Sequence, residues 1–416
     1  MKYIFRFLLG IASLIIGIAV WQYLFCPQLN FNSTSSFSGR NWYNPYSALP
    51  ANNWVKCNFH AHTKDWGGIT CGDGTSKDLW NVYAKLHYRV HCISEYQKIN
   101  RDFAKDSNYV PAYEHGYNLM KNHQLVIGDD KVTWADFLLP QTRSNKQWIL
   151  SQLNSSPKDV VVLNHPEVRS AYTTEDMKYL TGYQCIEVLN PNARSFSVWD
   201  AALSAGRPIF ITANDDIHYV LDRWNSGRFC TWLNVEKANR ESVVDALKSG
   251  KGYGMEVGFI PNEDTVTRRK RIRDNLPYLK SCEIQNDSLV VEFSKPACQI
   301  QFVGQGGKIL QQNDETEKVS YSLNDSDTYV RTAAVFSDSA KIYLNPVYRY
   351  AIHPLANKGG FTINTTKTML MRFLGIIILM AWILLFIRVV FGVELFRRRG
   401  ADEIPTKEPD QVILEL

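Results

Sequence analysis

Two histidines that could bind a metal ion, His60 and His62, stand one residue apart at the end of an apolar-alternating run, 54–59. On a strand, residues i and i+2 point to the same face, so both imidazoles can converge on one point where the strand ends. Such a pair is a modest signal alone, because two histidines on a polar face can simply be solvated. Metal binding is favoured here because acids and histidines recur at the ends of later apolar runs.

The other candidate side chains follow, or open, later apolar runs in the same way. They are Glu95, Tyr96, Glu114, His123, His165, Asp216 and His218. In parallel α/β folds the carboxyl ends of the strands form the floor of the active site, so these residues are expected to meet. Imidazole and carboxylate ligands without thiolate suit Zn, Mn or Fe. A carboxylate such as Glu114 can bridge two ions, and a two-metal site generates hydroxide near neutral pH.

This arrangement resembles the PHP (polymerase and histidinol phosphatase) superfamily of metal-dependent phosphoesterases over about residues 54–258. The resemblance implies a distorted barrel of seven β/α units that holds two or three divalent ions. It also implies hydrolysis of a phosphate ester on a small molecule or a polymer. The matching motifs are His60-Ala61-His62-Thr63, Asp73-Gly74-Thr75, Glu114, His123, His165-Pro166 and Asp216-Ile217-His218.

The resemblance further implies catalytic and metal-binding roles. Glu114 is expected to be essential, and Asp216 or His218 is expected to manage protons. Three metal sites are expected, and Glu114 is a ligand in both the first and the second. The first takes His60, His62, Glu114 and Asp216, the second takes Glu114, His123 and His165, and the third takes Asp73 and His218.

The sequence departs from the family after the second strand, where Glu95-Tyr96 stands in place of an Asp-His pair. A phenol can ligate and Glu95 can substitute, so the chemistry runs on two or three metals or the domain has lost activity. Asp65 competes with Asp73 for its role, since extra residues intervene before Asp73. Glu95 and Tyr96 are also candidate substrate contacts.

Arginines in loops after strand ends could neutralise a phosphate through the bidentate geometry of guanidinium. Arg194 is the best of them, because it follows the sixth strand. Arg169 and Arg223 are weaker candidates, and for all of them a surface position is favoured over a position in the site.

The elements that must position these residues alternate along the chain, which predicts β/α units around a parallel sheet. Most of the expected strands are largely apolar, as a sheet covered on both faces requires. Helical patterns lie between them, for example at 79–86 and 197–203. The expected strands are 55–59, 89–94, 109–113, 124–127, 160–164, 185–189 and 209–213.

From about residue 280 the pattern changes to short, polar-alternating runs, which predict an antiparallel, Ig-like β-sandwich. The basic cluster 268–273 is interpreted as a solvated face of a connector. The expected runs are 288–293, 299–303, 319–323 and 329–336. The expected domains are a lead-in at 27–53, the metal-dependent hydrolase at 54–260, the basic connector at 261–279 and the sandwich at 280–352.

Both ends of the chain carry apolar runs that could cross about 30 Å of hydrocarbon. We expect an uncleaved anchor at 1–26, with a signal peptide as the alternative, and a second transmembrane helix at 369–393. Basic residues flank the outer ends of both runs, which predicts that both termini are cytoplasmic. The protein is then anchored in the cytoplasmic membrane, and its main body lies in the periplasm. A linker at 353–368 and a cytoplasmic tail at 394–416 complete this arrangement.

The formal net charge of +5 on 416 residues gives no reason to expect nucleic acid as a partner. Among the eight cysteines, Cys282 and Cys298 are the one pair considered for a disulfide. The leading function is therefore a membrane-anchored, metal-dependent phosphoesterase. The alternatives are a degenerate barrel that binds or scaffolds without turnover, and a metal-dependent hydrolase of amides or esters.

Overall fold

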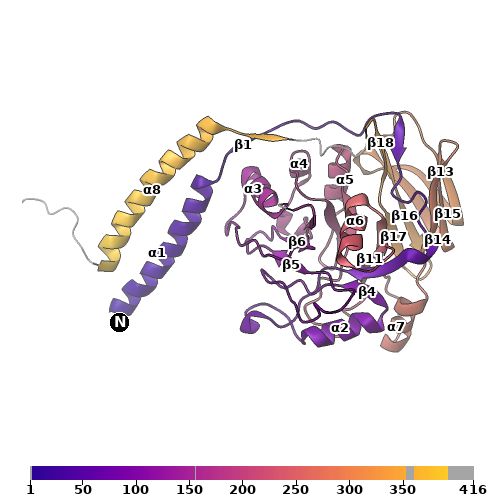
Figure 1. Cartoon of the computed structure of the whole chain (residues 1–416), viewed down its shortest axis with the longest axis horizontal. Helices are drawn as coiled ribbons and strands as arrows, with labels where there is room; N and C mark the ends of the chain where they lie inside the picture. Colours follow the sequence, from indigo (N-terminus) through magenta and orange to yellow (C-terminus); the bar gives the residue numbers. More distant parts are fainter. Residues whose placement is uncertain (1, 155, 353–359, 392–416) are drawn as a thin grey trace, which may run out of the picture. The chain divides into compact units, whose positions relative to one another are not determined.

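The computed structural model describes residues 2–154, 156–352 and 360–391 of the chain (Figure 1). It divides into two compact units, of which one spans Cys26–Thr368 and the other comprises Met1–Phe25 and Met369–Leu416. The predicted tail at 394–416 lies outside the described residues, as do residues 353–359 of the predicted linker.

The smaller unit contains the helix α1 (Lys2–Phe25) and nearly all of α8 (Thr365–Phe391). Both are long and apolar enough to cross a membrane by length and composition. They contact each other, because Trp382 Nε1 donates a hydrogen bond to Ser13 Oγ at 2.8 Å. Crossing and orientation stay predictions.

In the larger unit, one sheet has the strand order β10-β8-β7-β6-β5, with β9 paired to β8. β7, β8 and β10 run parallel, as predicted, but β6 is antiparallel to both of its neighbours. The parallel prediction is wrong for β6, and the short connection 116–123 cannot form the crossover that parallel pairing with β5 needs. The strands are β5 (Ala112–His115), β6 (Gln124–Ile127), β7 (Val160–Leu163), β8 (Cys185–Asn190), β9 (Ala193–Arg194) and β10 (Phe210–Ala213).

A second sheet has the order β13-β14-β16-β17-β12-β11-β3-β4, with β15, β18 and β2 attached beside this path. β12 pairs with β17, so hydrogen bonding is continuous between the predicted hydrolase and sandwich regions. The strands are β2 (Asn41–Tyr43), β3 (Trp54–Asn58), β4 (Tyr88–His91), β11 (Phe229–Asn234), β12 (Gly252–Glu256), β13 (Leu279–Gln285), β14 (Ser288–Gly304), β15 (Lys308–Ser322), β16 (Tyr329–Phe336), β17 (Lys341–Leu344) and β18 (Val347–Tyr350).

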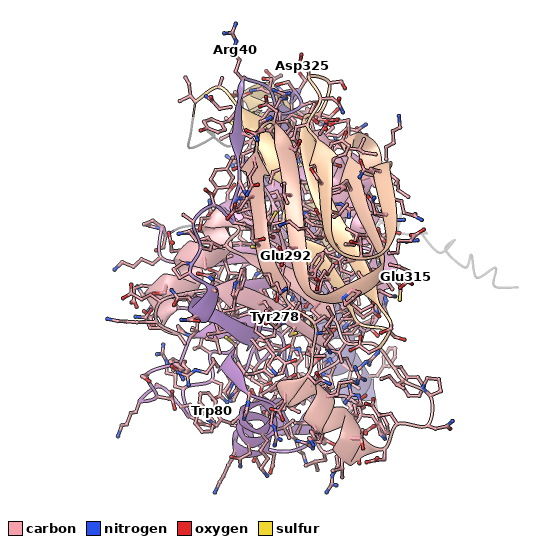
Figure 2. The ribbon with its side chains drawn as sticks, turned by 90° about the vertical axis from the view of Figure 1, so that its right-hand side faces the viewer. Arg40, Trp80, Tyr278, Glu292, Glu315 and Asp325 are labelled. Atoms are coloured by element: carbon pink, nitrogen blue, oxygen red, sulfur yellow. The ribbon has the colours of Figure 1, made fainter. Side chains whose placement is uncertain are left out.

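The predicted sandwich region consists of antiparallel strands, of which β14 and β15 are long, and Figure 2 shows them face on. The predicted runs 288–293 and 299–303 belong to the single strand β14. Glu292 on this strand pairs with Lys280 at 3.1 Å and Lys318 at 3.3 Å on the neighbouring strands. These cross-strand ion pairs lie on the polar face, as the alternation of the sequence predicts.

The two sheets approach each other where candidate site residues lie. Isolated parallel bridges join Ala61 to Ile217 and Tyr96 to Glu114. Phe59 N also donates to Asn214 Oδ1 at 2.8 Å. Within the described residues the strands form sheets joined by bridges, not one closed ladder, so the seven-unit barrel stays a prediction.

The helices of the larger unit begin at polar caps. Thr75 and Thr142 form capping boxes at the starts of α2 and α3, which satisfies backbone N–H groups that the helix leaves unpaired. α6 ends at Gly250, whose φ of 70° favours glycine. The helices are α2 (Ser76–Lys85), α3 (Arg143–Leu153), α4 (Thr174–Met177), α5 (Phe196–Ser204), α6 (Arg240–Ser249) and α7 (Thr265–Asp274). β1 (Leu29–Phe31) and β19 (Phe361–Ile363) form a separate antiparallel pair.

The basic cluster lies on α7, and its interpretation as a solvated face is wrong for two of its arginines. Arg268 and Arg271 are 4% and 8% exposed. Arg268 donates to Ser226 O at 3.1 Å, and Arg271 pairs with Glu263 at 2.7 Å. Partners outside the cluster therefore hold these two side chains in buried positions. No disulfide joins the pair considered, since Cys282 and Cys298 are both free thiols.

Candidate metal centre

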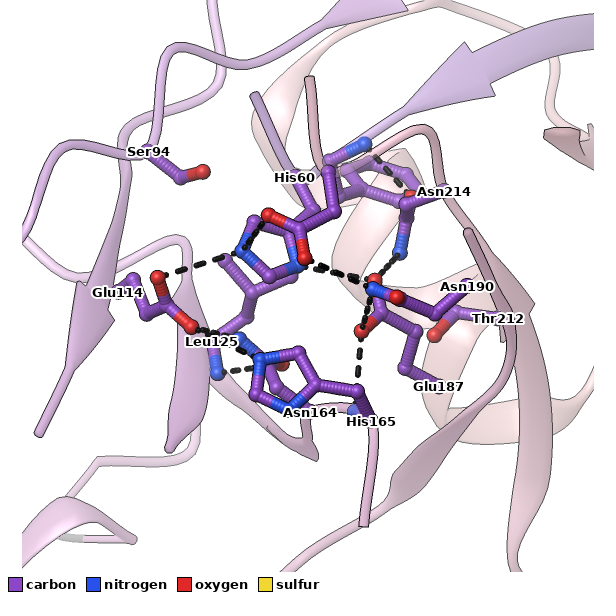
Figure 3. A network of polar contacts seen from close by, with 12 residues as sticks. His60, Ser94, Glu114, Leu125, Asn164, His165, Glu187, Asn190, Thr212 and Asn214 are labelled. Carbon is purple, nitrogen blue, oxygen red and sulfur yellow. Dashed lines mark hydrogen bonds and ion pairs between the residues drawn. The ribbon is translucent and has the colours of Figure 1, made fainter. Parts of the chain in front are cut away.

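Glu114, at the end of β5, is fully buried and faces four histidines. Its Oε2 lies 3.3 Å from His60 Nε2 and 3.2 Å from His62 Nε2. Its Oε1 lies 2.9 Å from His123 Nδ1 and 3.4 Å from His165 Nε2. Each carboxylate oxygen thus serves a different pair of imidazoles, and Figure 3 shows His60, Glu114 and His165 pointing toward one another.

Asp216 approaches the same point from the segment after β10. Its Oδ1 lies 3.2 Å from His60 Nε2, 3.6 Å from His62 Nε2 and 3.4 Å from His218 Nε2. Side chains spread over the chain therefore converge, as the strand-end pattern predicts. Four groups have ligand atoms within 4.8 Å of one another: His60, His62 and Glu114; Glu114, His123 and His165; His60, His165 and Asp216; and His62, Asp216 and His218.

The donor set fits divalent cations. His60 Nε2 and His62 Nε2 lie 3.1 Å apart and face the Glu114 and Asp216 carboxylates, an arrangement that suits coordination better than mutual hydrogen bonding. Glu114 Oε2, His62 Nδ1 and His165 Nδ1 are buried and have no hydrogen-bond partner within the described part of the chain. Buried polar atoms without partners are rare and call for an ion or water. Imidazole and carboxylate donors without thiolate suit Zn, Mn or Fe.

Electrostatics at this point favour positive charge. Burial by itself lowers the pKa of His60, but the carboxylates of Asp216, Glu187 and Glu114 outweigh it and raise that pKa well above its usual value. Burial also lowers the pKa of His62, but the carboxylates of Asp216 and Glu114 outweigh this effect and raise that pKa to about 9. Burial raises the pKa of Glu114 and of Asp216. The neighbouring imidazoles lower both pKa values by more, so that they lie well below the usual range.

Glu187 on β8 orients His60, a role that the sequence analysis missed. Its Oε1 lies 2.9 Å from His60 Nδ1 and accepts a hydrogen bond from Asn214 Nδ2 at 3.0 Å. Its Oε2 accepts from Asn190 Nδ2 and from the His165 backbone N–H, both at 3.0 Å. A carboxylate on Nδ1 turns Nε2 toward the centre, as in metal sites generally. The signal was available, because Glu187 is the one acid in the buried strand 185–190.

Asparagines hold the carboxylates, and these too were missed. Asn164 Nδ2 donates to Glu114 Oε1 at 3.0 Å, while its own Oδ1 accepts from Leu125 N at 3.0 Å. Asn190 Nδ2 donates to Asp216 Oδ2 at 3.1 Å. Asparagine supplies a donor to the carboxylate without adding charge. Its position at the ends of apolar strands was the usable signal.

Two of the ligand candidates have unusual backbone conformations. His165 has φ of 27° and Asp216 has φ of 43°, the left-handed region that side chains rarely adopt. Strain of this kind costs about 1–3 kcal/mol and concentrates at functional sites. Gly116 has φ of 124°, and a Cβ there would lie 2.8 Å from His123 Cδ2. The chain therefore needs glycine where it passes His123.

The third predicted metal site is only partly assembled. His218 groups with His62 and Asp216, and its Nδ1 lies 3.1 Å from Cys71 O. Asp73 belongs to none of the candidate groups among the described residues. Its carboxylate accepts from Leu221 N at 3.2 Å instead. The rival Asp65 pairs with Lys98 at 2.7 Å.

Glu95 and Tyr96 lie beside the cluster. Glu95 Oε1 accepts from Thr63 N at 3.0 Å, and its Oε2 lies 4.0 Å from His62 Nδ1. The Tyr96 ring stacks on His62 with centroids 4.6 Å apart. Burial, with Glu114 and Asp216 nearby, raises the pKa of the Tyr96 phenol. Tyr96 therefore contributes a neutral phenol at this position.

Arg194, the best predicted phosphate ligand, is committed elsewhere. Its Nη2 pairs with Glu256 Oε1 at 2.6 Å, and its guanidinium lies 4.5 Å from the Phe229 ring centroid. In this structure a carboxylate of β12 pairs with the guanidinium nitrogens that a phosphate would use, and the role of Arg194 in phosphate binding stays a prediction. Sequence spacing gave no indication of that partner, which lies 62 residues away.

The chain matches no protein-family model and no curated protein. Its structure is similar to the crystal structure of a two-domain protein from Bacteroides vulgatus that contains a predicted PHP-like metal-dependent phosphoesterase. The TM-score is 0.36 and the sequence identity 11%, over 76% of this chain and 99% of that one. A likeness this distant carries no argument, so the site is interpreted from its own side chains.

Proposed function

We propose that the chain is a metal-dependent hydrolase of phosphate esters. The observation that carries this proposal is Glu114, whose two oxygens each face a separate pair of histidines within 3.4 Å. A carboxylate with this arrangement suits two cations at once, the composition of sites that clamp an in-line displacement. Zn, Mn or Fe fits the donor types, with two or three ions per chain.

The predicted ligand residues would hold the cations, which supply Lewis acidity for the phosphoryl oxygens and acidify water. In the overall reaction, the oxygen of water bonds to phosphorus and the bond from phosphorus to the alcohol oxygen breaks. The alcohol leaves with a proton. The side chains of this protein fix the geometry, with Glu187 orienting His60 and Asn164 holding Glu114.

His218 is the best candidate for moving the proton. Its side chain has contact with solvent, since it is 23% exposed while Asp216 beside it is 6% exposed. The Nε2 of His218 lies 3.4 Å from Asp216 Oδ1, which can hold the ring in place. An imidazole at the rim can pass a proton between the leaving alcohol and bulk water.

The test is hydrolysis of p-nitrophenyl phosphate by the full-length protein in detergent with added Mn²⁺ or Zn²⁺. Glu114→Gln should reduce kcat by at least about a thousandfold, since it removes the shared charge. Glu317→Gln, on an exposed carboxylate of β15, is the matched control and should leave the rate unchanged. Full turnover by Glu114→Gln would exclude the proposed role.

A binding protein without turnover is the second candidate, and Tyr96 favours it. The aromatic ring stacked on His62 occupies the position where the resemblance expects a further histidine ligand. In that case phosphate esters would bind without being hydrolysed at any metal concentration. Hydrolysis of amides or carboxylic esters stays a further alternative, which the same preparation tests with aryl esters and anilides. The periplasmic location and the two membrane spans are proposals that accompany the enzyme.

A further inference from the structure

A cavity of about 510 Å³ adjoins the metal centre. Tyr96 and His123 form part of its wall and also contact the cluster, because Tyr96 stacks on His62 and His123 Nδ1 lies 2.9 Å from Glu114. A group bound in this cavity would therefore stand next to whatever reacts at the centre. None of the described residues that line it is acidic.

Two cations line the cavity. The Lys121 ammonium lies 5.9 Å from the Tyr96 ring centroid, and Arg169 Nη1 donates to Leu119 O at 2.7 Å. In the part of the chain that the structure describes, no carboxylate pairs with either. Both residues have positive φ, 61° and 53°. Cations without a carboxylate partner at a cavity beside a phosphoryl site favour an anionic ligand.

Flat aromatic side chains form the other wall. Trp66 and Trp134 pack edge to face, with centroids 6.2 Å apart, and are 41% and 57% exposed. Trp66 is fixed in addition by a hydrogen bond from its Nε1 to Tyr96 O at 2.8 Å. Exposed aromatic residues around a concave site are typical of pockets that stack a ring of the ligand.

Gln97 provides the polar group. It lines the cavity and is 6% exposed, yet neither its side-chain oxygen nor its nitrogen has a hydrogen-bond partner among the described residues. Its backbone N–H donates to Glu114 O at 2.8 Å, and its φ is 52°. An amide buried without partners is destabilising, and a ligand with a donor and an acceptor would satisfy it.

We propose that this cavity binds the leaving group of the substrate, which is a phosphate ester of an alcohol that carries a ring with a face able to pack on an aromatic side chain. The ring packs against Trp66 and Trp134, and Gln97 bonds to a polar edge of the ring. Lys121 and Arg169 attract the negative charge of the ester. The inference rests on the proposed function, whose site supplies the reacting phosphoryl position. A nucleobase and a sugar both satisfy this chemistry.

Binding separates this inference from the proposed function. Full-length protein in detergent and EDTA is titrated with adenosine 5′-monophosphate, glucose 6-phosphate and glycerol 3-phosphate by calorimetry. At least one ring-bearing ester should bind about tenfold or more tightly than glycerol 3-phosphate, and which one does so identifies the ring. Equal binding of all three would overturn the inference even if p-nitrophenyl phosphate is hydrolysed.

Variants then locate the effect. Trp134→Ala and Lys121→Met should each reduce the affinity for the preferred ester about tenfold, and Gln97→Leu should reduce it similarly. Trp134 is exposed, so its replacement is compatible with folding. Lys77→Met, on an exposed lysine of α2, is the control and should bind as the parent does. Parental affinity in both Trp134→Ala and Lys121→Met would contradict the assignment.

Discussion

Glu187 Oε1 lies 2.9 Å from His60 Nδ1 and thereby decides which nitrogen of His60 faces Glu114. Both residues are fully buried, and Glu187 is held in turn by amide and backbone donors. A ligand histidine oriented in this way loses little freedom when a metal binds. The metal centre is therefore supported by the buried strand β8, which contributes no predicted ligand.

Glu187→Gln should weaken metal binding by about 10–100-fold, because the amide removes the charge that supports the His60 imidazole. The measurement is a competitive titration of Zn²⁺ or Mn²⁺ against a chelator of known affinity. Glu283→Gln, on a strand of the sandwich region, serves as the control and should leave the affinity unchanged. An affinity in Glu187→Gln equal to that of the parent would exclude Glu187 from this role.

Arg194 and Glu256 should behave as a structural pair. A double-mutant cycle with Arg194→Met and Glu256→Gln should give a coupling free energy of about 1 kcal/mol in urea unfolding, because the pair is partly exposed. The KM for p-nitrophenyl phosphate should stay within about twofold of the parent in Glu256→Gln. No coupling, together with a large rise in KM in Arg194→Met, would restore Arg194 as a substrate ligand.

The carboxylate of Asp176 should make the free energy of unfolding decrease at acidic pH. Burial opposes ionisation, but the ammonium of Lys146 at 2.7 Å outweighs it and holds the pKa of Asp176 below its usual value. Stability from this depressed pKa is present above the unfolded value of about 4 and is lost as the pH falls through the folded pKa. Asp176→Asn should cost about 3 kcal/mol at pH 7, where it leaves Lys146 buried and unpaired.

The check on Asp176 is the difference in unfolding free energy between parent and Asp176→Asn at pH 7 and at pH 3. The difference should shrink at the lower pH, because the carboxylate takes up a proton in the unfolded state before it does so in the folded state. A difference that is the same at both values would mean that the ion pair contributes nothing. Asp245→Asn, whose carboxylate is 68% exposed, is the control.

Asp200 and Arg331 join α5 to β16 through a buried, two-pronged ion pair. Arg331 Nε and Nη2 donate to the Asp200 oxygens at 2.8 and 2.7 Å, and Tyr329 Oη donates to Asp200 at 3.1 Å. Asp200→Asn should lower the free energy of unfolding by about 3–5 kcal/mol, because Arg331 stays buried without a counter-charge. Thermal unfolding of the two proteins side by side gives the comparison, and an unchanged Tm would contradict the assignment.

The sequence predicted the elements with strong periodicity. The bounds of β6 and β16 agree with the predicted runs, and the ligand candidates that follow strand ends do converge, since strand direction and period decide where such residues point. It did not predict what depends on remote partners. The pairing of Arg194 with Glu256, the burial of Arg268 and the continuity of β14 all depend on tertiary contacts.

The supporting residues of the metal centre were missed for a related reason. Glu187 and Asn190 are polar residues in a strand that is otherwise apolar, which marks them as unusual but does not show which side chains they contact. The role of Glu187 depends on its contact with His60, which lies 127 residues away in the sequence. Asp73 was assigned by motif alone, and its carboxylate instead accepts from the Leu221 backbone.

The number of metal ions per chain, in parent and Glu114→Gln, tests the central claim most directly. Elemental analysis of the purified full-length protein should find at least two divalent ions per chain in the parent, since Glu114 is proposed to serve both pairs of histidines. Glu114→Gln should lose at least one of them while keeping the far-UV spectrum of the parent. Fewer than two ions in the parent, or an unchanged content in Glu114→Gln, would contradict a bridged metal centre.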